Sequence, residues 1–224
     1  MRKSLNNLEK NQIQVILKGN WDVKVTENLL IQKGEFKIYE TYNRKSFSNL
    51  LSNKDHLFSL YITNTTNFNY GAIVYTSIEQ VENINDYIST LVLNQKCKFV
   101  WYRNSDKDFM CLYALKINGE EGAIVTGTDI ESMKFNRDQR SASNEIEIRF
   151  KESAVDLWAD ATKRNISNEI VFLLDNNVVA APKVFSTITD GQAVLTGNFS
   201  QTEAKYIASL GNNGELPISF KVIK

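Results

Sequence analysis

The stretch Glu169–Gly211, EIVFLLDNNVVAAPKVFSTITDGQAVLTGNFSQTEAKYIASLG, decides the fold of this 224-residue chain. It begins with EIVFLLD, an apolar run typical of a buried strand. Asp175, Asn176 and Asn177 predict a tight turn, because Asn tolerates positive φ better than most residues. VVAAP leaves the turn as a second strand. Pro182 is expected to end it, since proline has no N–H to give to a β-ladder.

The rest of this stretch predicts a short strand and a capped helix. QAVLTG reads as a strand between turns at Gly191 and Gly197, where glycine allows the chain to reverse. SQTEAKYIASLG predicts a helix, because Ser200 and Glu203 have the S-x-x-E spacing of a capping box. Gly211 is expected to end that helix.

Outside this stretch the pattern alternates between strands and helices. Strands are expected at 13–19, 35–42, 56–63, 72–76, 96–102, 108–115, 143–150 and 216–223. Helices are expected at 22–34, 46–51, 78–93 and 153–165, the last with Ala154, Leu157, Trp158 and Ala161 on its apolar face. This mixture predicts an α+β fold of two small subdomains, whose antiparallel-rich mixed sheets are packed by helices. We expect the boundary at a polar turn near residue 120, which gives regions 1–120 and 121–224.

Charge and hydropathy argue against a nucleic-acid-binding protein and against a membrane-spanning chain. Lysine plus arginine equals aspartate plus glutamate, 26 each, so the basic excess of a nucleic-acid-binding protein is missing. No run of about 18 apolar residues predicts a membrane span, and no signal-peptide core follows Met1. The protein is therefore either cytoplasmic or carries a targeting segment that this sequence does not include.

The sequence lacks the motifs of nucleophilic and phosphate-binding sites. His56 is the one histidine, and no G-x-S-x-G motif accompanies it. Gly122 and Gly127 have phosphate-loop spacing but lack the lysine that would reach a phosphate. Cys97 and Cys111 lie in apolar strands, where a hairpin turning near residue 104 could place them opposite each other. Two buried thiols are the favoured interpretation, with a disulfide as the alternative.

Metal and acid–base sites are equally unsupported. One histidine and two distant cysteines do not form a zinc site. Asp129, Glu131 and Asp138 lack calcium-loop spacing and read as surface charges. Asp175 is the best candidate for a catalytic carboxylate, although the predicted turn already accounts for it. We therefore expect no enzyme activity, cofactor or metal.

The sequence from residue 169 to 223 closely resembles the head of the first periplasmic domain of SecD and SecDF, accessory proteins of protein export. That family has a strand ending in LDG, then V-x-S-A-P, I-T-G-G, I-x-G-x-F-T-x-x-E-A and G-x-L-P. Upstream, IVTGTDI at 124–130 matches the family's L-T-G-x-x-I. The matching positions, interpreted as structural, are Thr126, Gly127, Asp175, Ala181, Pro182, Thr189, Gly191, Gly197, Phe199, Glu203, Ala204, Gly214, Leu216 and Pro217.

Residues 13–42 resemble the second half of the family's base subdomain more weakly, which implies a ferredoxin-like character for the base. Three positions depart from the family pattern, since Lys18 replaces a proline and Asn176 and Asp190 replace glycines. The first strand and helix of the base have no counterpart. An uncovered sheet edge is therefore expected, through which the chain would form a homo-oligomer or bind a partner.

The resemblance implies a non-catalytic extracytoplasmic domain that assists Sec-dependent translocation. Its partners would be an unfolded or translocating polypeptide and the membrane components of the Sec translocon, without nucleic acid. It would lie in the periplasm or on the outer face of the cytoplasmic membrane, given a targeting or anchoring segment outside this sequence. An envelope binding or adaptor module that kept the head fold and lost the export role is the alternative. A hydrolase using Asp175 ranks third.

Overall fold

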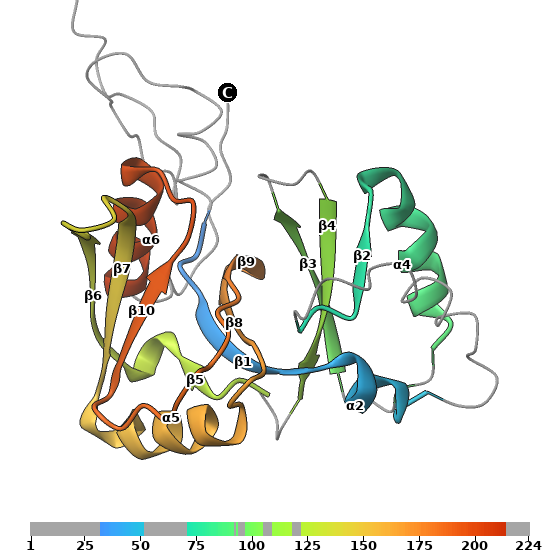
Figure 1. Cartoon of the computed structure of the whole chain (residues 1–224), viewed down its shortest axis with the longest axis horizontal. Coiled ribbons are helices and arrows are strands. Elements are labelled where there is room, and N and C mark those ends of the chain that lie inside the picture. The colour runs from blue at the N-terminus through green and yellow to red at the C-terminus, as the bar shows by residue number, and fades with distance from the viewer. Residues whose placement is uncertain are drawn as a thin grey trace, which may run out of the picture. The chain divides into compact units, whose positions relative to one another are not determined.

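A computed structural model of the chain describes residues 32–51, 71–91, 93, 97–104, 109–117 and 122–213 (Figure 1). All of these except Gln32 belong to one compact unit, residues 33–217. The expected strands at 13–19, 56–63 and 216–223, and all but the last three residues of the helix at 22–34, lie outside the described residues. So do His56, Gly214, Leu216 and Pro217.

The fold is α+β, as predicted, with antiparallel strand pairing between all of the named strands. Its strands are β1 (Phe36–Tyr42), β2 (Val74–Thr76), β3 (Cys97–Asn104), β4 (Phe109–Lys116), β5 (Val125–Thr126), β6 (Ile130–Arg137), β7 (Asn144–Phe150), β8 (Ile170–Leu174), β9 (Asn177–Ala180) and β10 (Gln192–Thr196). Its α-helices are α2 (Arg44–Ser48), α4 (Val81–Ser89), α5 (Glu152–Arg164) and α6 (Gln201–Asn213), and single 3₁₀ turns occupy Ile78–Gln80 and Gly127–Asp129.

Strand β1 connects the N-terminal and C-terminal parts of the larger sheet. That sheet has the order β2-β4-β1-β8-β9, with β3 also on β4 and β5 also on β1. Phe36 to Glu40 pair with Leu174 to Ile170 of β8. The other edge of β1 pairs with β5 at Lys37 and Ile38 and with β4 at Thr41 and Tyr42. Every residue of β1 therefore pairs with at least one neighbouring strand, and Lys37 and Ile38 pair on both edges.

Strand β8 is buried on both faces, which explains its uninterrupted apolar sequence. Ile170, Phe172 and Leu174 enter one hydrophobic core. Val171 and Leu173, pointing the other way because side chains alternate along a strand, enter a second core. All five residues of β8 are buried, so the predicted buried strand is confirmed. A polar residue at any of these positions would lie in one core or the other.

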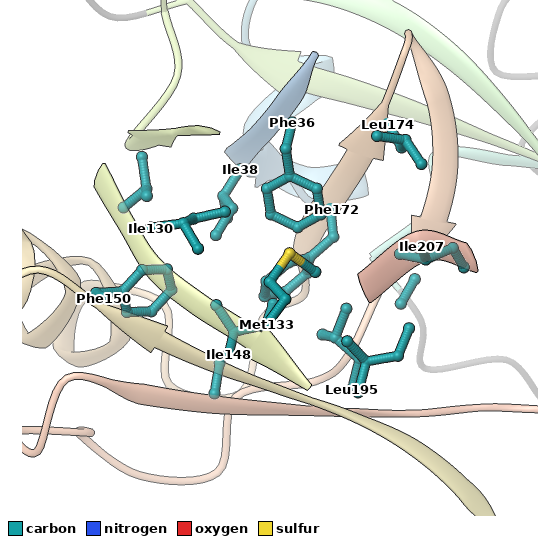
Figure 2. Close-up of a cluster of buried hydrophobic side chains, with 14 of the residues drawn as sticks. Phe36, Ile38, Ile130, Met133, Ile148, Phe150, Phe172, Leu174, Leu195 and Ile207 are labelled. Carbon is teal, nitrogen blue, oxygen red and sulfur yellow. The ribbon is translucent and has the colours of Figure 1, made fainter. Parts of the chain in front are cut away.

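The first core lies between β1 and β8 on one side and β6, β7 and β10 on the other (Figure 2). Figure 2 shows the Met133 side chain at its centre, near Phe172 and Ile148. Helix α5 adds Trp158, whose ring centroid is 5.0 Å from that of Phe150 and 6.1 Å from that of Phe172. These contacts bring one helix and strands from both sheets into a single packed cluster.

Strand β4 separates the second core from a third. Cys111, Tyr113 and Leu115 face the second core, which they share with Val171 and Leu173 of β8. Leu112 and Ala114 face the opposite way and pack with side chains from α2, β2 and α4, namely Phe47, Val74 and Ile84, and with Ile73. The larger sheet therefore has apolar cores on both of its faces.

The smaller sheet has the order β10-β7-β6, and α6 packs on β6 and β7. The predicted capping box of α6 is confirmed: the Ser200 N–H donates to Glu203 Oε2 at 2.8 Å, and the Glu203 N–H donates to Ser200 Oγ at 3.2 Å. Ala204 belongs to the first core and the partly buried Phe199 packs against it, as expected of a hydrophobic staple. The cap fixes where α6 begins over the sheet.

The prediction that Gly211 ends α6 is wrong, because the helix continues to Asn213. Gly211 is instead a point of close packing. A Cβ added to it would lie 1.9 Å from Sδ of Met133, which is 1% exposed. Glycine is therefore required by a tertiary contact between α6 and β6, although the local sequence reads as a helix stop.

The favoured interpretation of the cysteines as free thiols is confirmed, although only Cys111 is fully buried and Cys97 is half-buried. Cys97 pairs with Lys116 and Cys111 pairs with Tyr102, so the alternative, a disulfide between opposite residues, is wrong. The hairpin register, with Asn104 opposite Phe109, offsets them. Leu157, expected on the apolar face of α5, is 53% exposed. The helix buries Ala154, Trp158, Ala161 and Thr162 instead.

We expect Gly211→Ala to destabilise the fold by about 1–3 kcal/mol, because the new methyl group overlaps Met133 in a packed core. Helix propensity alone predicts the opposite, a gain of about 1 kcal/mol. Urea unfolding of the variant, with Ser209→Ala on the exposed face of α6 as control, distinguishes the two. A Gly211→Ala chain as stable as the parent would contradict the packing, and adding Met133→Ala is expected to make the two changes non-additive.

Candidate functional site

Asp175, the best sequence candidate for a catalytic carboxylate, holds the start of β1. Its Oδ1 accepts from the Glu35 N–H at 2.9 Å and its Oδ2 from the Gly34 N–H at 3.2 Å. Its own N–H donates to the Glu35 carbonyl at 2.9 Å. With φ of 50° and 65° at Asp175 and Asn176, the predicted tight turn is confirmed. Both carboxylate oxygens are used by backbone donors, an arrangement suited to fixing a strand end.

We expect Asp175→Ala to destabilise the fold by about 1–3 kcal/mol, since two backbone donors lose their acceptor. Asn176→Gly is the matched control, because glycine adopts its positive φ without strain and is expected to change stability by less than about 1 kcal/mol. Urea unfolding measures both. Equal losses in the two variants would show that the turn, and not the carboxylate, is what matters.

Several other motif residues within the described part of the chain also make contacts that fix the backbone. Thr126 and Asp129 form a reciprocal capping box around the 3₁₀ turn that begins at Gly127. Gly191 has φ of +67°, and a Cβ there would lie 2.7 Å from Cγ2 of Val155. The Pro182 carbonyl accepts from the Ile170 N–H at 3.1 Å. None of these contacts brings reactive side chains together.

The segment after Pro182 presents one large apolar side chain to solvent. Phe185 is 83% exposed, yet the backbone on either side of it is hydrogen-bonded. Val184 accepts from the Ser167 N–H at 2.8 Å and donates to the Asn168 carbonyl at 2.9 Å. The Ile188 N–H donates to Thr162 Oγ1 at 3.0 Å. Phe185 therefore protrudes from a segment that is anchored at both ends.

Phe185 stands at an open apolar groove of about 210 Å³ between this segment, α5 and β10. The apolar lining comes from Trp158, Ile170, Phe172, Pro182, Val184, Phe185, Ile188, Ala193, Val194 and Leu195. Its polar members are Thr162, Lys183 and Ser186. No carboxylate lines the groove, so it offers no pair of acids for hydrolysis. It suits the binding of apolar groups.

The two edges of the smaller sheet differ. On β6 the Asn212 side chain covers the edge at Met133: its Oδ1 accepts from the Met133 N–H and its Nδ2 donates to the Met133 carbonyl, each at 2.6 Å. Within the described ranges no strand pairs with the outer edge of β10. Val194 on that strand is 50% exposed. The open edge and the apolar groove lie on the same element.

Two buried carboxyl groups lie outside the groove, and their pKa values shift in opposite directions. Burial opposes ionisation of Glu40, but hydrogen bonds from Arg164, Lys116 and Asn165 outweigh it and lower its pKa. Arg164 Nη2 lies 2.7 Å and Lys116 Nζ 3.1 Å from its carboxylate oxygens. This network joins β1, β4 and α5, so its charges are already paired within the fold.

Glu169 has the opposite shift. Burial raises its pKa, and hydrogen bonds from the Gly71 N–H and the Tyr113 hydroxyl offset this only in part. Its Oε2 is buried and has no hydrogen-bond partner among the residues that the structure describes. The Glu169 carboxyl group therefore keeps its proton to a higher pH than an exposed glutamate does.

Because the folded pKa of Glu169 is raised, its protonated form stabilises the fold fully below the pKa of the unfolded chain, and this stability is lost as pH rises through the folded value. Glutamine has no carboxyl group to ionise, so the Glu169→Gln variant does not lose this stability as the pH rises. We expect the variant to gain stability relative to the parent as pH increases above about 4.3, the ordinary glutamate value. Urea unfolding at a series of pH values measures the difference, and a difference that does not vary with pH would contradict it.

The described part of the molecule shows no cluster of metal ligands and no helix that could span a membrane. No group of three or more histidine, cysteine, aspartate or glutamate side chains gathers there around a possible metal position. None of the helices described there is long and apolar enough to cross a bilayer.

Comparison with known proteins agrees with the sequence resemblance. Residues 112–218 match the family model of the SecDF P1 head subdomain. Residues 112–218 are therefore similar to the head subdomain of the SecD/SecDF family. Protein translocase subunit SecD of Acidaminococcus fermentans is 35% identical over 105 residues, which cover 47% of this chain and 25% of that protein. SecD of Mycobacterium tuberculosis is 31% identical over 102 residues, covering 44% of this chain and 18% of that protein.

The matched segment thus spans a quarter or less of these two SecD proteins. Solved structures extend the likeness of fold over most of the chain. A structure described as "a membrane component SecDF that enhances protein export" covers 95% of this chain and 81% of its own, with a TM-score of 0.51 and 19% identity. SecDF in a "Super-membrane-facing form" covers 88% of this chain and 21% of its own, again with a TM-score of 0.51 and 19% identity.

The head motif does not point to the groove directly. Of the motif residues named above that lie in the described part of the chain, only Pro182 lines the groove. The sequence did not identify Phe185 and Val194 as exposed residues, because an isolated apolar residue in a sequence gives no sign of its exposure. The one local signal is KVFST, in which an aromatic residue follows the strand-ending Pro182 and precedes a polar turn.

Proposed function

We propose that the chain is a non-catalytic accessory domain of Sec-dependent protein translocation that contacts the exported polypeptide through the groove beside β10. The head-subdomain match over residues 112–218 is the observation that carries this proposal. The groove supports it, because an unfolded chain exposes the apolar side chains that such a surface binds. Contact with membrane components of the translocon belongs to the same proposal and would use other surfaces.

The proposed place of action is the periplasm or the outer face of the cytoplasmic membrane. The chemistry of the groove is compatible with this location, since binding through apolar side chains and backbone hydrogen bonds needs no nucleotide, metal or cofactor.

An envelope adaptor with a retained head fold would use the groove for a folded partner. The two proposals differ in what reaches Phe185 during export, because an adaptor would bind its partner whether or not a polypeptide is being translocated. Self-association through the uncovered sheet edge expected in the base stays a prediction.

We expect a photoreactive phenylalanine analogue at position 185 to capture a polypeptide stalled during export in intact cells. Glu131, an exposed residue of β6, is the matched control and is expected to give little capture. Crosslinked products identified by immunoblotting of the stalled chain measure the effect. Equal capture at 131 and 185, or none at 185 under active export, would overturn the proposed function. Capture of one folded protein independent of export would favour the adaptor.

A further inference from the structure

We propose that the outer edge of β10 binds the exported polypeptide as an added β-strand, with Val194 and Thr196 supplying its backbone hydrogen bonds. This inference rests on the proposed function and deepens it, because it specifies the conformation and the side-chain pattern of the segment that binds. It follows from the hydrogen-bond register of the smaller sheet and from the groove beside it.

The register shows which backbone groups of β10 point away from β7. The Phe150 N–H donates to the Gly191 carbonyl at 2.9 Å, and β10 pairs antiparallel with β7 from Gln192 to Thr196. In an antiparallel pair, hydrogen-bonded residues alternate with residues whose N–H and C=O point outward. Ala193 and Leu195 therefore bond to β7, whereas Gln192, Val194 and Thr196 direct their backbone groups to the outer edge.

The first of these outward positions is already occupied. The Gln192 N–H donates to Asp190 Oδ1 at 3.1 Å, and the Gln192 carbonyl accepts from Trp158 Nε1 at 3.0 Å. These two bonds confirm that Gln192 points outward. In the described part of the structure no such side chain covers Val194 or Thr196, so the open part of the edge begins at Val194.

The opposite edge of the same sheet, on β6, has covered backbone groups and charged side chains. Asn212 occupies both backbone groups of Met133, and exposed charged residues, Glu131, Lys134 and Arg137, lie along β6. Covered backbone groups and charged side chains are means by which proteins prevent strands from adding to an edge. Strand β10, with the sequence QAVLT, has no charged residue. Among the described residues, nothing of this kind keeps an incoming strand from the β10 edge at Val194 and Thr196.

The spacing of Val194 and Thr196 and the lining of the groove indicate which polypeptide segment would bind. Val194 and Thr196 are two residues apart, about 6.6–6.8 Å along a strand, and an extended polypeptide repeats its outward N–H and C=O at the same interval. The added strand would lie beside the groove lined by Phe172, Val184 and Ile188, with Phe185 at its mouth. Alternate side chains of that strand would enter the groove. The structure thus favours extended segments with apolar residues at every second position and no proline.

The first test compares Val194→Pro with Val194→Ala. Proline removes the outward N–H of residue 194, while its position at a sheet edge leaves the β10–β7 bonds in place. Alanine keeps that N–H and removes only the side chain. The probe is a fluorescein-labelled peptide with seven alternating valine and threonine residues between lysines, and fluorescence anisotropy measures its binding to the full chain. We expect about tenfold weaker binding for Val194→Pro, one lost hydrogen bond, and less than about threefold for Val194→Ala.

A second test needs no variant and remains valid if Val194→Pro does not fold. The same peptide, N-methylated on every second residue, loses the donors of one edge, and methylation of the alternate set removes those of the other. Only one edge of an added strand faces β10. Methylation of the N–H groups on that edge is therefore expected to abolish binding, whereas methylation of the alternate N–H groups is expected to have a smaller effect. Equal binding by both methylated peptides, no binding of the parent peptide, or equal affinities of Val194→Pro and Val194→Ala would overturn strand addition. Capture at Phe185 would then still decide the proposed function on its own.

Discussion

The antiparallel pairing of β1 with β8 is the constraint on which the other features depend. Phe36 to Glu40 pair with Leu174 to Ile170, and Asp175 fixes the register by accepting the N–H groups of Gly34 and Glu35. Apolar side chains alternate across both strands, so Phe36, Ile38 and Phe172 enter the first core while Tyr39 and Val171 enter the second. If this pairing slipped by one residue, β1 would exchange the side chains that it presents to the two cores.

The groove and the open edge are consequences of this arrangement. β8 continues through the Asp175 turn into β9 and then to Pro182, whose carbonyl accepts from the Ile170 N–H. The following segment is held by α5 through Thr162 and returns to the smaller sheet as β10. The groove lies where this segment meets β10 and α5. Its shape is therefore set by β8, α5, β10 and the segment after Pro182.

Local signals predicted local structure well. The Asp175–Asn176 turn, the Ser200–Glu203 capping box and the buried β8 depend on residues near one another in the sequence, and the structure confirms them. Contacts between distant segments could not be read in this way. Gly211 resembles a helix stop until Met133 is placed against it, and the cysteine register depends on the loop of the β3–β4 hairpin. The exposure of Phe185 and Val194 depends on hydrogen bonds to α5 and β7, so the groove was not predicted.

Hydrogen exchange of the full chain, followed by mass spectrometry, tests the shared β1 strand most directly. If β1 is an integral strand of the sheet that contains β8, peptides covering Ile38–Glu40 and Ile170–Leu174 will exchange equally slowly, through global unfolding alone. Both should speed up together as denaturant is added. Rapid exchange in β1 while β8 stays protected would show that the C-terminal part of the fold is complete without β1, and would contradict the account.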